Sequence, residues 1–254
     1  METLLIQIFI FFLGACLGSF ANVLIYRIPK AISIFMPGSR CPCCNISIKW
    51  RDNIPIISFF LLRTLCRNCK NPISIIYPLV EFLVALAMFV IWSLTGEFIT
   101  FVIFGFLAFM LIVITFIDLK HSIIPDSLSI TILLAGFVIS PLNQHLGPDF
   151  VIRIIYSFVG IFSGAAIMYL IGFTGEKIFK KESLGGGDIK LMAGAGAFLG
   201  WEGVVFSLFI GSFIGTLVSL FLIYALKTKT WGDYIPFGPF LSMGIIFYIL
   251  FFVR

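Results

Sequence analysis

The sequence predicts an all-α polytopic membrane protein with about eight transmembrane helices and a cytoplasmic insert that forms a zinc knuckle. The first observation is composition: hydrophobic residues make up 60% of the 254 residues and charged residues 11%, with a mean hydropathy of +1.13. A soluble domain carries about 25% charged residues. The second observation is that the apolar residues form long runs without strict alternation. In lipid such runs favour helices, because a helix satisfies its own backbone polar groups.

The apolar residues fall into eight segments, which predict the transmembrane helices in order. They lie at roughly 4–26, 76–94, 98–117, 127–142, 151–173, 187–200, 203–226 and 237–253. The first is expected to be a retained helix and not a signal peptide, because its basic residues follow the apolar run. The fourth and sixth are short and polar at one end, so we expect them to be tilted or partly buried. The chain therefore divides into a first helix at 1–27, a hydrophilic insert at 28–75 and a polytopic domain at 76–254.

The third observation is the distribution of basic residues, which predicts the orientation. If the amino terminus lies outside, 15 of the 17 basic residues fall inside, and the two exceptions are Arg153 and Arg254. This asymmetry predicts an even number of spans, with both termini on the outer side of the membrane. A basic face beside anionic membrane lipid accounts for the net charge of +5, so no nucleic-acid partner is expected.

Four cysteines in the insert have the spacing of a metal site. Cys41 and Cys44 form one C-x2-C pair, and Cys66 and Cys69 form a second after twenty-one intervening residues. Two such pairs can place four thiolates around Zn²⁺, and a closed four-sulfur shell indicates a structural role. The predicted cytoplasmic side is reducing, which disfavours disulfides, and an insert of this size has too little core to fold alone. A metal-free thiol cluster and a site in which Cys43 replaces Cys44 are the alternatives.

Two aspartates interrupt the apolar pattern at the same predicted membrane border. Asp118 ends one apolar run, and Asp188 follows Gly185 and Gly187 at the start of another. Two carboxyls at one site share a proton, so the ionised member can activate water and the protonated member can polarise a peptide carbonyl. The glycines allow close backbone approach and unusual dihedral angles. The alternative for each aspartate is a helix cap or a lysine partner.

Two further acidic residues are supporting candidates. Asp126 follows Pro125 at the start of an apolar segment, and an N-cap role is favoured over a catalytic one. Glu81 lies about one turn inside the second apolar segment, where it would either extend to the interface or bind a cationic group.

Several sequence blocks occur in a fixed order along the chain. They are 18–29, the two cysteine pairs, 77–78 with Glu81, 118–126, 184–191 and 235–240. Together they resemble the type IV prepilin peptidase/N-methyltransferase family, also called leader peptidases, which are GxGD-type membrane aspartyl proteases. The resemblance covers almost the whole chain. One departure is Thr64, near which the family often has a glycine before the second cysteine pair.

The resemblance implies two activities. One removes the basic leader of type IV prepilins or pseudopilins at the cytoplasmic face, with Asp118 and Asp188 as catalytic residues. The other methylates the new amino-terminal residue with S-adenosyl-L-methionine and is linked to the insert, although the residues that hold this donor do not follow from the sequence. The alternatives are a leader peptidase without methyltransferase activity and an ion transporter or metal-sensing scaffold. The choice between pilus assembly and type II secretion, and the oligomeric state, stay open.

Overall fold

The computed structural model describes residues 2–36, 38–180, 184–228, 230 and 235–253. Lys181, Lys229 and Arg254, which enter the charge argument, lie outside the described residues. Within them the regular secondary structure is helical, and β pairing is limited to two isolated bridges in the insert. The prediction of an all-α fold is therefore confirmed.

Seven helices of fourteen or more residues follow the predicted apolar segments. They are α1 (Glu2–Arg27), α3 (Ile76–Thr95), α4 (Phe98–His121), α5 (Asp126–Ile139), α6 (Phe150–Phe179), α7 (Gly186–Leu220) and α8 (Gly238–Phe252). Five of them, α1, α3, α4, α6 and α7, are long and apolar enough to cross a membrane, and α5 and α8 are shorter apolar helices. A short helix in the insert, α2 (Ile57–Leu61), completes the set.

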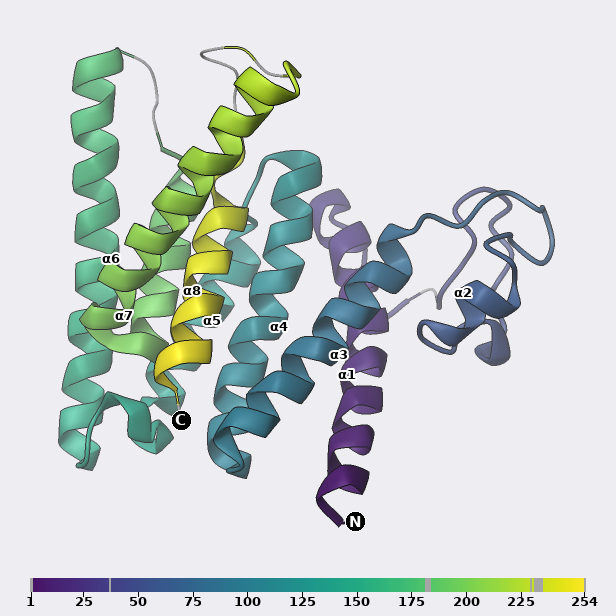
Figure 1. Cartoon of the computed structure of the whole chain (residues 1–254), viewed down its shortest axis with the longest axis horizontal. Helices are drawn as coiled ribbons and strands as arrows, with labels where there is room; N and C mark the ends of the chain where they lie inside the picture. Colours follow the sequence, from purple (N-terminus) through teal and green to yellow (C-terminus); the bar gives the residue numbers. More distant parts are fainter. Residues whose placement is uncertain (1, 37, 181–183, 229, 231–234, 254) are drawn as a thin grey trace.

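Helix α7 contains two of the predicted segments, which meet at a sharp reversal. Gly200 has φ 71° and ψ −178°, a conformation that only glycine adopts without strain. The chain turns back there, so that both ends of α7 lie at the same end of the molecule (Figure 1). All eight apolar segments are thus helical. The described ends of α1 and α8 that adjoin the two termini lie apart from each other, both at the other end of the molecule (Figure 1).

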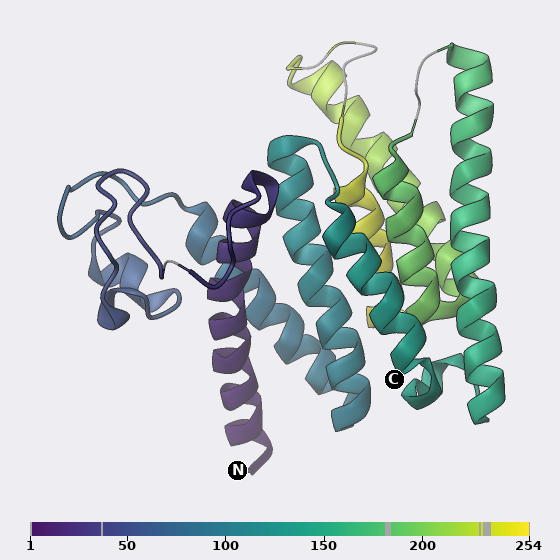
Figure 2. The ribbon, with the colours of Figure 1, turned by 180° about the vertical axis from the view of Figure 1, so that it is seen from behind.

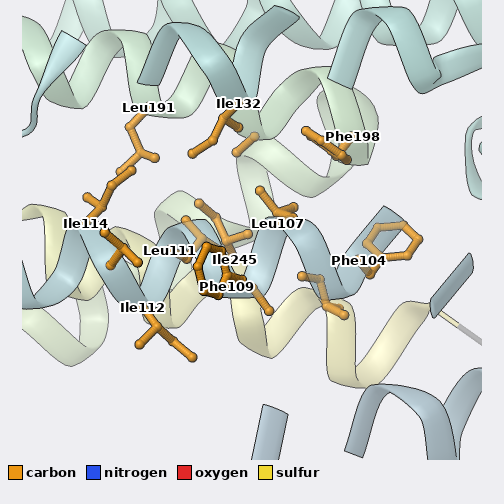
Figure 3. Packing of buried hydrophobic residues seen from close by; sticks show 14 of the residues in the cluster. Phe104, Leu107, Phe109, Leu111, Ile112, Ile114, Ile132, Leu191, Phe198 and Ile245 are labelled. Carbon is orange, nitrogen blue, oxygen red and sulfur yellow. The ribbon is translucent and has the colours of Figure 1, made fainter. Parts of the chain in front are cut away.

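Helix α4 forms the centre of the protein. It packs against α1 and α3 on one side and against α5 and α8 on the other (Figures 1 and 2). Its side chains Leu107, Leu111 and Ile114 are fully buried. Figure 3 shows this row facing apolar side chains of the neighbouring helices, which include Ile132 of α5 and Ile245 of α8. The core therefore fixes the positions of the helix ends that carry the acidic residues.

Glycines allow the closest helix pairs to approach. A methyl group added to Gly18 of α1 would lie 2.5 Å from the Cα atom of Glu81 in α3, and one added to Gly160 of α6 would lie 2.0 Å from the carbonyl oxygen of Gly196 in α7. Small residues commonly form helix contacts in membranes, where packing and not the hydrophobic effect holds helices together.

Candidate functional site

Asp118 lies in the last turn of α4 and is 2% exposed. The backbone N–H of Gly238, the first residue of α8, donates a hydrogen bond of 3.0 Å to its Oδ2 atom. This bond joins groups that are 120 residues apart in the chain. It fixes the carboxyl of Asp118 against the start of α8.

Asp188 lies in the first turn of α7 and is 6% exposed. Its backbone N–H bonds to the carbonyl of Gly185, but its Oδ1 atom has no hydrogen-bond partner among the described residues. A buried carboxyl oxygen is rarely left without a partner, because its desolvation is unfavourable. The Asp188 carboxyl is therefore a candidate to bind a reacting group.

The two aspartates lie at neighbouring ends of α4 and α7. The side chain of Ile124 packs between residues next to both. A methyl group added to Gly187 would lie 2.8 Å from the Cβ atom of Ile124, and one added to Gly238 would lie 3.1 Å from its Cδ1 atom. Gly187 directly precedes Asp188, and Gly238 is bonded to Asp118. Asp118 also lies within electrostatic reach of Asp188. The arrangement brings both carboxyls to one buried place between α4, α7 and α8.

The glycines before Asp188 are needed for the room that a missing side chain leaves, and not for unusual dihedral angles. Gly185, the residue before α7, has φ −73° and ψ 139°, and neither Gly186 nor Gly187 has a positive φ. A side chain on Gly186 would meet open space, whereas one on Gly187 would collide with Ile124. The expectation of unusual dihedral angles is therefore wrong, and close approach at Gly187 is what the structure requires.

Asp126 does not cap α5. The helix begins at Asp126 itself, the preceding Pro125 occupies the capping position, and no side chain caps the helix. Asp126 instead forms an exposed ion pair with Lys190, with 2.7 Å between its Oδ1 atom and the lysine Nζ atom. The prediction of an N-cap role fails because the helix starts one residue earlier than expected and because α7 brings Lys190 alongside.

Glu81 does not extend to the interface, because its carboxyl bonds to the insert. Its Oε2 atom accepts a hydrogen bond of 2.6 Å from the backbone N–H of Ile56, and Ser19 of α1 also bonds to the carboxyl. Ile56 precedes α2 and has a φ of 63°, which is unusual for a β-branched residue. Glu81 therefore attaches the insert to α3.

The four predicted cysteines come together in the insert. One ligand atom from each of Cys41, Cys44, Cys66 and Cys69 lies within 4.8 Å of the others. The Sγ atoms of Cys41 and Cys69 are 3.8 Å apart, close to the separation of about 3.8 Å that tetrahedral Zn–S bonds of about 2.3 Å require. Cys43 is exposed and outside this group, so its use as a ligand is not supported. The thiols present fit a four-coordinate metal ion.

The two cysteine pairs have the same backbone pattern. In each, the N–H of the first cysteine bonds to the carbonyl five residues later, and the N–H four residues later bonds back to its carbonyl. Backbone amides of Cys69 and Asn68 lower the pKa of Cys66 to about 6. The backbone amide of Ile46 lowers the pKa of Cys44 in the other pair. These amides stabilise thiolates, the form that binds metal.

A cavity of about 890 Å³ lies between the insert and the α1–α3 pair. Its lining combines hydroxyl, aromatic, amide and carboxyl side chains, which include Ser19, Asn22, Tyr26, Asn53, Tyr77 and Glu81. This cavity was not predicted from the sequence. The available signal was the set of polar residues within the otherwise apolar α1 and α3, which lie on the faces that the insert covers.

Comparison with known proteins identifies the family. Residues 12–95 match the bacterial peptidase A24 N-terminal domain, and residues 105–220 match the type IV leader peptidase family. A prepilin leader peptidase/N-methyltransferase of Myxococcus xanthus is 38% identical to this chain. The alignment covers 87% of this chain and 64% of that protein. Proteins of the same name from Vibrio cholerae and Aeromonas hydrophila are 34% and 30% identical, and the alignments cover 92% and 87% of their lengths.

No solved structure matches this chain. The relatives nevertheless align over most of its length, and the two family matches follow each other in the order of the blocks described above. The chain belongs to the type IV leader peptidase family.

Proposed function

We infer that this protein is a prepilin leader peptidase and N-methyltransferase of the bacterial cytoplasmic membrane. The observation that carries the peptidase activity is the buried pair of carboxyls from α4 and α7, one of which has an oxygen without a partner. Family membership and the names of the relatives support both activities.

Asp118 and Asp188 are proposed to act as an aspartic protease pair. Two neighbouring carboxyls in a water-poor site cannot both ionise cheaply, so they share one proton and titrate as a unit. The ionised carboxyl takes a proton from water as the water oxygen bonds to the scissile carbonyl carbon. The protonated carboxyl donates a hydrogen bond to the carbonyl oxygen. A proton then passes to the leaving amine as the C–N bond breaks.

The position of this pair suits a prepilin substrate. The last turn of α4 and the first turn of α7 lie at the end of the molecule away from both termini (Figure 1). With the termini outside, as the basic residues favour, the pair faces the cytoplasmic surface. A prepilin whose apolar helix lies in the bilayer and whose basic leader lies in the cytoplasm would present its cleavage site there.

The cavity beside the insert is proposed to hold S-adenosyl-L-methionine. Its volume falls within the range of about 300–1,000 Å³ typical of small-molecule sites. The rings of Tyr26 and Tyr77 can stack on the adenine, and amides such as Asn22 can bond to the ribose or the amino-acid part. The Glu81 carboxylate favours a cationic ligand. When bound, this donor supplies the methyl group that is transferred to the pilin amine.

The four cysteines are proposed to bind a structural Zn²⁺. Cys41 and Cys66 also line the cavity, so a metal that fixes them would hold one of its walls in place. A shell of four thiolates leaves no open position for a reacting group.

The peptidase proposal is tested by Asp118→Asn and Asp188→Asn in the full membrane protein. Each substitution is expected to lower prepilin cleavage by at least about a thousandfold, because loss of one carboxyl removes the shared proton. Cleavage is measured as a gel shift of the prepilin. Asp126→Asn is the matched control, since Asp126 belongs to an exposed ion pair and should leave cleavage intact. Normal cleavage by either variant of the pair would contradict the proposal.

The methyl-donor site is tested by direct binding of S-adenosylhomocysteine, the product of methyl transfer, measured by calorimetry. Asn22→Ala and Tyr77→Ala are expected to weaken binding about tenfold or more, while prepilin cleavage continues. Binding unchanged in both variants would place the donor elsewhere. No binding by the unaltered protein would favour a leader peptidase without methyltransferase activity.

A further inference from the structure

Helix α2 presents an apolar face that nothing in the described residues covers. Ile57, Phe60 and Leu61 lie on one side of the helix and are 44%, 69% and 72% exposed, while Phe59 points inward at 8%. Trp50, 82% exposed, lies in a short turn that packs against α2. We call Trp50, Ile57, Phe60 and Leu61 the apolar edge of the insert.

Basic side chains flank the apolar edge. Lys49 and Arg51 lie on either side of Trp50 in the sequence, and Arg63 follows Leu61 by two residues; all three are exposed. The insert, 28–75, contains seven basic residues and a single acidic one, Asp52. Asp52 is already bonded to Arg67 through two guanidinium nitrogens. The surface around the edge is therefore suited to an anionic partner.

The depth of α2 identifies that partner. Ile56, the residue that precedes α2, bonds to Glu81, and Glu81 lies more than one turn inside the apolar span of α3 (Ile76–Thr95). The insert accordingly lies beside α1 and α3, level with the part of α1 that ends at Arg27, and not beyond that end (Figures 1 and 2). At this level α1 and α3 are parts of helices long and apolar enough to cross a membrane, so a lipid leaflet is expected around them.

We propose that the apolar edge enters the lipid leaflet around the Arg27 end of α1, where Lys49, Arg51 and Arg63 bind the phosphates of anionic lipids. An amphipathic element with aromatic residues on one side and basic residues around it is the typical form of such an interfacial anchor. The apolar edge then continues the lipid-facing surface of α1 and α3. One consequence is that the cavity between the insert and these helices lies at the membrane surface.

Trp50 reports directly on this contact. In the full chain, Trp92→Phe, Trp201→Phe and Trp231→Phe leave Trp50 as the one tryptophan. The protein is reconstituted in phosphatidylcholine vesicles with and without phosphatidylglycerol. Lipids that carry a nitroxide near the headgroup are expected to quench Trp50 fluorescence about twofold or more, and soluble acrylamide should quench it weakly. Phosphatidylglycerol should strengthen the lipid quenching.

Two variants test the separate contributions. Phe60→Ser with Leu61→Ser is expected to reduce lipid quenching of Trp50 in both lipid mixtures. Lys49→Glu with Arg51→Glu should remove the effect of phosphatidylglycerol, whereas Lys70→Glu, outside the apolar edge, should retain it. Protease resistance within 28–75, unchanged from the unaltered protein, shows that the insert of each variant is folded. Strong acrylamide quenching without lipid quenching would overturn the proposal, because the edge would then face water. Lipid quenching that appears only at low protein-to-lipid ratio, with weak acrylamide quenching at high ratio, would also overturn it, because a second copy would then cover the edge.

Discussion

Ile124 controls the space between the two carboxyls. Its side chain packs against Gly187 on one side and Gly238 on the other. Gly187 precedes Asp188 in the sequence, and Gly238 is hydrogen-bonded to Asp118. Because both carboxyls are buried, their geometry depends on this packing as much as on the carboxyls themselves.

Gly187→Ala should therefore impair the peptidase without altering either carboxyl. The added methyl group would lie 2.8 Å from the Ile124 Cβ atom, so α7 or the loop before α5 must shift. A displacement of about 1 Å at a catalytic site can lower the rate about a hundredfold, and we expect a loss of this size in prepilin cleavage. Gly186→Ala is the matched control, since its methyl group meets open space. Equal activity of the two variants would show that Ile124 does not constrain the site.

Single residues differed in how well the sequence predicted their surroundings. Asp118 and Asp188 could be selected because a charge at the end of an apolar run needs an explanation. The hydrogen bond from the Gly238 N–H to Asp118 could not be predicted. The two residues are 120 positions apart in the chain, and the bond depends on how α8 packs. Asp126 shows the opposite error: a local capping pattern was favoured, but the neighbouring helix supplied Lys190 as the partner.

At the scale of elements, the two cysteine pairs differ in how easily their backbones adopt the required turn. The residue after each second cysteine, Asn45 or Lys70, has a left-handed conformation, with φ of 56° and 57°. Asparagine tolerates this conformation better than lysine does. The second pair is therefore the more strained of the two.

Lys70→Gly is expected to stabilise the insert by about 0.5–1 kcal/mol, because glycine removes the left-handed strain at some cost in unfolded-state entropy. The gain is measured as resistance of the insert to urea, followed by protease cleavage within 28–75. Asn45→Gly is the matched comparison and should give a smaller gain. A larger gain from Asn45→Gly would contradict the account of strain.

Packing of α6 against α7 depends on backbone contact at Gly160. A methyl group there would lie 2.0 Å from the Gly196 carbonyl oxygen, and backbone cannot move aside as a side chain can. Gly160→Ala is expected to destabilise the protein by at least about 2 kcal/mol, seen as a lower thermal unfolding midpoint in detergent. In Gly105→Ala, the control, the closest atoms to the methyl group are at the flexible end of Met88, and the ring of Phe101 lies at ordinary contact distance. Similar midpoints for the two variants would refute a tight α6–α7 contact.

The positions of the helices could be predicted from the lengths of the apolar segments. Which helices pack against each other could not. The reversal at Gly200 falls at the boundary between two apolar segments, so the sequence separated the two halves of α7 correctly. The pairing of α1 with α3 and of α6 with α7 needed a different signal. Glycines four residues apart, Gly14 with Gly18 and Gly160 with Gly164, line these contacts and could have indicated them.

At the scale of the whole molecule, the two proposed sites lie on different sides of α4. The carboxyl pair is formed by α4, α7 and α8, whereas the cavity is formed by α1, α3 and the insert. Helix α4 packs between these groups (Figure 1). Composition and charge could predict the membrane fold, but this separation results from helix packing, which neither one specifies. A consequence is that each site should be removable without loss of the other.

Removal of the metal from the insert tests this separation. The insert has few buried apolar side chains, Cys41 and Phe59 among its described residues, so its fold should depend on the bound ion. A strong zinc chelator, or Cys66→Ser, is therefore expected to abolish S-adenosylhomocysteine binding and methylation of the pilin amino terminus, followed by mass spectrometry. Prepilin cleavage should fall by less than about threefold, because the carboxyl pair lies at the ends of α4 and α7 beside α8, whereas the insert packs beside α1 and α3, and distant sites act independently. Cys16→Ser, at an exposed thiol of α1 outside both the cluster and the cavity, should change neither activity. Parallel loss of cleavage and methylation on chelation would mean that the insert supports the whole molecule and not the cavity alone.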